Sequence, residues 1–106
     1  HLQVTTDRDV FSNLQAKTLQ LKIYYETKEW EALESHITTM KTYIRRHARI
    51  PYHRDNYLRI ISYTKQLMQL DRTKPTALAQ LYQQIEAEPS LTEKEWLLEC
   101  LKTEVK

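Results

Sequence analysis

The chain has 106 residues, of which 41% are hydrophobic and 28% charged, and its formal net charge is +2. This length corresponds to one domain, and no apolar run approaches the roughly 18 residues that a membrane-spanning helix needs. A net charge this small does not imply a polyanionic partner.

The chain contains no glycine and a single cysteine, Cys100. Turns with positive φ usually draw on glycine, and tight β-hairpins depend on such turns, so the composition argues strongly against an all-β fold. One cysteine cannot form an intrachain disulfide and is compatible with a reducing compartment. We therefore expect a cytoplasmic all-α domain over residues 1–106, built from antiparallel hairpins of about five helices.

Apolar residues at a spacing of 3–4 predict a first helix over residues 7–26, with Thr6 as its N-cap. One stripe of this helix consists of Phe11, Leu14, Thr18, Leu21 and Tyr25. A second stripe, nearly opposite the first, consists of Ala16, Leu19 and Ile23. A helix that is apolar on two sides needs cover on two sides, either from the third or fifth helix of this chain or from a partner or an upstream segment.

A second helix is predicted over residues 28–47, after a very short connection at Thr27 and Lys28. That connection makes the first two helices antiparallel neighbours in a hairpin over residues 6–48. The helix ends in Arg45, Arg46 and His47, where cations suit the helix dipole. Its single apolar stripe is Trp30, Leu33, Ile37, Met40 and Ile44.

Pro51 and Pro75 each begin a further helix, and together these helices form a predicted second hairpin over residues 50–87. Tyr52 and Tyr63 lie off the main apolar stripe of the third helix, so we expect both to be exposed. The buried face of the third helix should be Tyr57, Ile60, Ile61, Thr64, Leu67 and Met68, and the fourth helix carries Leu78, Leu81, Tyr82 and Ile85.

A C-terminal helix is predicted over residues 91–105. Two overlapping capping boxes, Ser90-x-x-Glu93 and Thr92-x-x-Glu95, mark its start. Cys100 should be a small buried hydrophobic residue within it. The other candidates for its buried face are Trp96, Leu97, Leu98, Leu101 and Val105.

Residues 21–33 resemble the helix–turn–helix centre of a tetratricopeptide (TPR) repeat, with Tyr24 or Tyr25, Trp30 and Ala32 at its aromatic and small positions. Lys28 departs from the pattern, because the family usually has glycine in the turn, and both helices are longer than the typical dozen residues. The wider chain resembles the C-terminal region of bacterial TPR-like proteins of unknown function. The resemblance implies the end of an α-solenoid in a longer chain and brings no catalytic residues. The second stripe of the first helix would then mark the place of a missing neighbouring repeat.

The segment from Lys41 to Arg59 is the most basic part of the chain and has tyrosines interleaved. Arginine beside aromatic rings can bind phosphates and stack on bases, and the same residues act as hot spots in protein interfaces. The simpler interpretation is that these are solvated cations at helix ends. The basic residues are Lys41, Arg45, Arg46, Arg49, Arg54 and Arg59, against Asp55 alone.

No pattern in the chain predicts a catalytic site, a metal site or a cofactor. A structural zinc site needs four ligands at a recognisable spacing, whereas His47 and His53 lie on either side of Pro51 and there is no second cysteine. Nothing nominates a base that would activate Cys100, and a phosphate-binding glycine loop cannot form without glycine.

These observations predict a non-enzymatic helical-repeat module that mediates protein–protein contact, either with a protein partner or with neighbouring repeats of the same chain. One alternative is a nucleic-acid-binding domain that uses the basic corner between Arg45 and Arg54; another is an accessory domain of an enzyme whose catalytic part lies upstream. The candidate partner surface is Ala16, Leu19, Ile23, Arg45, Arg46, Arg49, Tyr52, His53 and Arg54.

Overall fold

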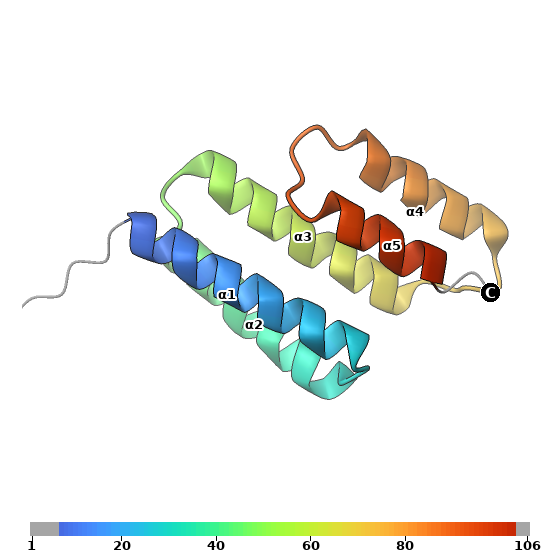
Figure 1. Cartoon of the computed structure of the whole chain (residues 1–106), viewed down its shortest axis with the longest axis horizontal. Coiled ribbons are helices and arrows are strands. Elements are labelled where there is room, and N and C mark those ends of the chain that lie inside the picture. Colours follow the sequence, from blue (N-terminus) through green and yellow to red (C-terminus); the bar gives the residue numbers. More distant parts are fainter. Residues whose placement is uncertain (1–6, 104–106) are drawn as a thin grey trace, which may run out of the picture. The chain divides into compact units, whose positions relative to one another are not determined.

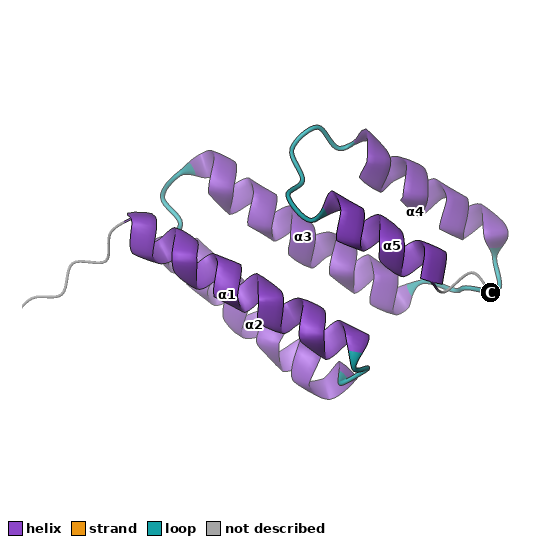
Figure 2. Cartoon of the chain, viewed as in Figure 1, coloured by secondary structure: helices purple, strands orange, loops and turns teal. Residues whose placement is uncertain are grey.

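The computed structural model describes residues 7–103, and every regular element in that range is an α-helix (Figures 1 and 2). This confirms the predicted all-α class with five helices. The chain divides into two compact units, His1–Leu58 and Arg59–Lys106, with the border inside α3. The helices are α1 (Asp7–Glu26), α2 (Trp30–His47), α3 (Pro51–Gln69), α4 (Pro75–Ala87) and α5 (Lys94–Thr103).

In the first unit, α1 and α2 pack side by side as an antiparallel hairpin, as predicted (Figure 1). The Asn13 side-chain amide donates to the Tyr43 hydroxyl at 2.9 Å, and His36 Nε2 donates to the Lys17 carbonyl at 2.8 Å. These bonds link the two helices at the edge of their apolar contact. The most buried residues of the two stripes are Leu14, Leu21, Leu33, Met40 and Ile44.

The turn between α1 and α2 has the hydrogen bonds of a Schellman motif. The amide of Lys28 donates to the Tyr25 carbonyl at 3.1 Å, and the amide of Glu29 donates to the Tyr24 carbonyl at 2.9 Å. Lys28 itself has a φ of 60°, in the left-handed region. A residue in that conformation cannot belong to a right-handed helix, so α2 begins at Trp30 and the predicted start at residue 28 is wrong.

Two aromatic residues of the predicted apolar stripes are more exposed than expected. Trp30 is 42% exposed because it is the first residue of α2, directly after the turn, and its ring packs edge to face against that of Tyr25 at 5.4 Å. Phe11 is 37% exposed and contacts the rings of His53 and Tyr57 on α3.

In the second unit, α4 packs closely against α5, while the predicted pairing of α3 with α4 is looser. The turn between α3 and α4 is polar, as predicted. The Asp71 carboxylate accepts hydrogen bonds from the Thr73 hydroxyl at 2.6 Å and from the Thr73 amide at 3.0 Å, which lower the pKa of Asp71. The most buried residues of this unit include Ile60, Ile61, Thr64, Leu67, Ile85 and Leu97.

The last helix begins at Lys94, so the predicted start at residue 91 is wrong. Residues 92–93 form a turn before the helix, closed by the Lys94 amide, which donates to the Leu91 carbonyl at 3.3 Å. Leu91 is buried, and the Ser90 carbonyl accepts a hydrogen bond from Arg59. Ser90 lies four residues before the start of α5 and is therefore not its N-cap. The predicted cap Thr6 and the predicted contact of Val105 lie outside the described residues.

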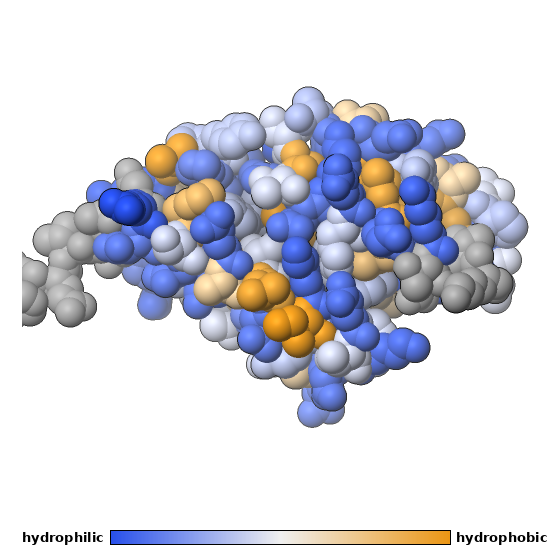
Figure 3. All heavy atoms as spheres, in the orientation of Figure 1, coloured by the Kyte–Doolittle hydropathy of each residue, from blue (hydrophilic) through white to orange (hydrophobic). Residues whose placement is uncertain are grey.

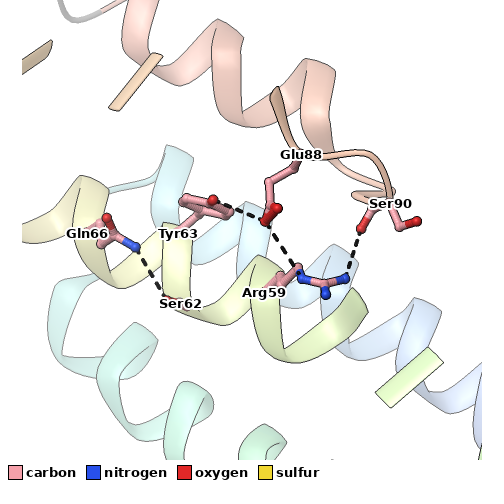
Figure 4. Close-up of polar contacts among 6 residues, drawn as sticks. All are labelled: Arg59, Ser62, Tyr63, Gln66, Glu88 and Ser90. Carbon is pink, nitrogen blue, oxygen red and sulfur yellow. Dashed lines mark hydrogen bonds and ion pairs between the residues drawn. The ribbon is translucent and has the colours of Figure 1, made fainter. Parts of the chain in front are cut away.

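The connection between α4 and α5 is held by α3 (Figure 4). The Tyr63 hydroxyl donates to Glu88 Oε2 at 3.2 Å, and Arg59 Nε lies 3.7 Å from the same oxygen. Tyr63 is only 5% exposed, so its predicted exposure is wrong; helix periodicity did not anticipate a partner 25 residues further along the chain. Burial raises the pKa of the Tyr63 phenol above its ordinary value, and the charge of Glu88 acts in the same direction.

Candidate interaction surface

The second apolar stripe of α1 is exposed, and we call it the outer stripe: Ala16, Leu19 and Ile23. The exposed fractions of Leu19 and Ile23 are 56% and 45%. At 3.6 residues per turn these residues lie opposite the buried Leu14 and Leu21. In the face that Figure 3 draws, hydrophobic atoms gather over the second half of α1.

Along the middle of the outer stripe no charged residue lies between the two ends of α1, while Lys22, three residues after Leu19, lies at its edge. The same spacing of 3–4 leads from the stripe back to Ser12 and Arg8, and forward to Glu26. Lys17 belongs to the side that faces α2, because its Nζ lies 4.7 Å from the centre of the Tyr43 ring. Several turns of uncharged surface on an exposed helix face are typical of a face that packs against another protein.

The predicted basic residues gather at the corner between α2 and α3, which we call the basic corner: Arg45, Arg46, Arg49 and Arg54. All four are exposed, and no carboxylate within residues 8–102 forms an ion pair with any of them. Tyr52, beside them, is 58% exposed, as predicted. The corner therefore offers four guanidinium groups and one aromatic ring to a partner.

His53 has a different environment from its neighbours in the corner. It is half-buried, with its ring centre 5.1 Å from that of Phe11 and 5.5 Å from that of Tyr52. The adjoining hollow, which Phe11, Arg49 and His53 help to line, has a volume of about 10 Å³, enough for no more than a single water. His53 thus fastens α3 to α1, and the corner is a surface rather than a pocket.

The structure separates the nine predicted surface residues into two sets. The outer stripe occupies residues 16–23 of α1, whereas His53, next to the basic corner, packs against Phe11 in the first half of α1. Sequence reasoning missed that Arg8, Ser12 and Glu26 extend the outer stripe. These three residues continue the 3–4 spacing of the outer stripe in both directions, and that spacing is the signal that identifies them.

The remaining candidate groups are packed within the hairpin or in the core. His36 lies against Tyr24, and His47 lies against Tyr43. Cys100 is buried, as predicted. Within the described part of the chain, no three histidine, cysteine, aspartate or glutamate side chains are grouped so that they could hold a metal ion.

Comparison of the chain with protein-family models, with curated proteins and with solved structures found no match. Among residues 7–103, no helix has the length and apolar character needed to cross a bilayer. Over residues 7–103 the structure thus defines an all-α arrangement of five helices, with an exposed apolar stripe on α1 and a basic corner between α2 and α3.

Proposed function

We propose that this chain is a non-enzymatic helical module that binds another protein through the outer stripe of α1. The observation that carries the proposal is the exposure of Leu19 and Ile23 on the face opposite the buried stripe. Covering the exposed part of each side chain would contribute roughly 1 kcal/mol. Three residues make a small contact, so we place the stripe at the centre of the interface and the polar residues Gln15 and Gln20 at its rim.

The turn and its aromatic contact support a TPR-like arrangement of the α1–α2 hairpin. Lys28 stands where that family usually has glycine, and it adopts the left-handed conformation that glycine enters without steric cost. Tyr25 and Trp30 meet edge to face across the turn. In a solenoid, each repeat packs against its neighbours along such a hairpin face, so a neighbouring repeat is one form that the bound protein could take.

Site-specific photo-crosslinking tests the proposal. A photo-reactive amino acid is placed at position 19 of the protein expressed in its own cells, and at position 34 as a control, because Glu34 is exposed on α2. We expect specific adducts from position 19 that disappear in the Ile23→Glu variant and are absent from position 34. If position 19 gives no adduct, or the same adducts as position 34, the outer stripe is not a binding surface.

Nucleic-acid binding by the basic corner is a second candidate, favoured by four exposed arginines beside the exposed Tyr52, none of which has a carboxylate partner within residues 8–102. Binding of this kind weakens steeply with salt. We expect an oligonucleotide to bind with a slope of log K against log salt that falls by about one when Arg46 or Arg54 is changed to alanine. Undetectable binding at low salt, or binding that salt does not change, would exclude this candidate.

A further inference from the structure

We propose that the protein bound by the outer stripe is a second copy of this chain, with the two α1 helices paired antiparallel about a two-fold axis. This inference rests on the proposed binding role of the stripe and names its partner. The outward residues of α1 follow the 4-3-4-3 spacing by which helices form coiled-coil contacts. They are Ser12, Ala16, Leu19, Ile23 and Glu26.

The sizes of these side chains favour the antiparallel orientation. The first half of the face carries the small residues Ser12 and Ala16, and the second half carries the large residues Leu19 and Ile23. In an antiparallel pair, Leu19 of one copy faces Ala16 of the other, and Ile23 faces Ser12. Each large side chain then packs over a small one, as close-packed helix interfaces require. A parallel pair would place large residues against large ones and leave the small ones apart.

The charges at the two ends of the face favour the same orientation. Arg8 lies at the first turn of α1 and Glu26 at its last residue, both on the side of Leu19. An antiparallel pair brings Arg8 of each copy to Glu26 of the other, twice by symmetry. A parallel pair would bring arginine to arginine and glutamate to glutamate. The opposed helix dipoles add to the preference for antiparallel pairing.

The size of the contact predicts a weak dimer. The 20 residues of α1 span about 30 Å, and a contact between two helices of this length lies at the low end of specific interfaces. We therefore expect a dissociation constant on the order of 10–100 µM, with monomer at low concentration and dimer at high concentration.

Sedimentation equilibrium of the whole chain, from about 1 µM to about 500 µM, tests the pairing. We expect the wild type to move from monomer to dimer mass over this range and Leu19→Glu to stay monomeric. Arg8→Glu and Glu26→Arg should each raise the dissociation constant about 3- to 10-fold, and the double variant Arg8→Glu/Glu26→Arg should return it to within about 2-fold of wild type. Glu34→Arg, on the outward side of α2, is the matched control and should leave the dimer unchanged.

The charge swap distinguishes the two orientations, because in a parallel pair a single reversal would leave like charges facing one another and the double reversal would restore nothing. A chain that stays monomeric throughout, or a dimer that Leu19→Glu does not disturb, would overturn the inference. If the chain is monomeric but position 19 crosslinks to a different protein, the proposed function stands and the partner is wrong. If it is monomeric and position 19 gives no adduct, both fail.

Discussion

Among the described residues, Lys28 is the one with a positive φ, a backbone conformation that residues other than glycine rarely adopt. A left-handed φ brings Cβ close to the following carbonyl and costs a residue other than glycine roughly 1–2 kcal/mol. The Schellman bonds of the turn hold Lys28 there, because they satisfy the last carbonyls of α1. The chain thus makes a tight helix–helix turn without glycine, at an energetic cost confined to one residue.

We expect Lys28→Gly to stabilise the protein by about 0.5–1 kcal/mol, because the relief of left-handed strain exceeds the entropy that glycine adds to the unfolded chain. Urea denaturation measures the difference. Glu29→Gly is the matched control one residue later: its φ is −86°, so glycine relieves no left-handed strain there and should stabilise the protein less than Lys28→Gly does. Equal effects at the two positions would contradict this account of the turn.

Tyr63 contacts the α4–α5 connection through its hydroxyl, which donates a hydrogen bond to the carboxylate of Glu88. We expect Tyr63→Phe to lower the free energy of unfolding by about 1 kcal/mol at neutral pH, because Glu88 loses a hydrogen bond at a partly buried site. The control is Tyr52→Phe, at an exposed tyrosine of the same helix. That change should leave the urea midpoint unmoved, and a loss of similar size there would contradict the assignment.

The raised pKa of Tyr63 predicts a loss of stability in alkali. The folded state favours the neutral phenol, so this contribution is fully present below the ordinary tyrosine pKa of 10.0 and is lost as the pH rises through the higher folded pKa. The free energy of unfolding should therefore fall more steeply above pH 10.0 in the wild type than in Tyr63→Phe. Parallel pH profiles for the two proteins would show that Tyr63 ionises equally in the folded and unfolded states.

At the scale of the element, α1 carries two apolar faces, one buried and one exposed. Leu19→Glu and Ile23→Glu change exposed positions, so each should cost less than about 1 kcal/mol in the monomer. Leu21→Glu places a carboxylate at a residue with no exposed surface, and we expect it to unfold the domain. Thermal melts followed by circular dichroism at low concentration compare the three. Unfolding by all three would mean that the outer stripe is internal core.

Helix periodicity predicted most of the elements, because local spacing decides which residues share a helix face. The end of α1 at Glu26 was predicted to the residue, and the starts of α3 and α4 followed from Pro51 and Pro75. The predicted starts of α2 and α5, at residues 28 and 91, were wrong, because each start depends on a turn. One turn uses a left-handed lysine, and the other holds Ser90 against Arg59 of a distant helix.

At the scale of the whole molecule, α3 is the element that both compact units share. Tyr57, before the border, and Ile60, after it, are both buried. Each unit also contains one tryptophan, Trp30 or Trp96, so fluorescence can report on each unit separately.

We expect the two units to unfold together, because loss of structure in either removes packing from the same helix. Urea unfolding of Trp96→Phe follows the first unit, and that of Trp30→Phe follows the second; circular dichroism follows both. After correction for the stability cost of each change, the midpoints from fluorescence and circular dichroism should coincide in each variant. Separate transitions would instead divide residues 1–106 into two domains, against the single domain that the length predicts.

By itself the sequence determined the all-helical class, most of the helix bounds and the main buried stripes, because these follow from propensity, proline position and the 3.6-residue period. Only the tertiary structure decided which second faces are covered. Ala16, Leu19 and Ile23 are exposed, whereas Tyr63 is buried. A side chain is buried by segments that are distant in the chain. The 3–4 spacing of apolar residues within one helix does not indicate which distant segment will pack against it.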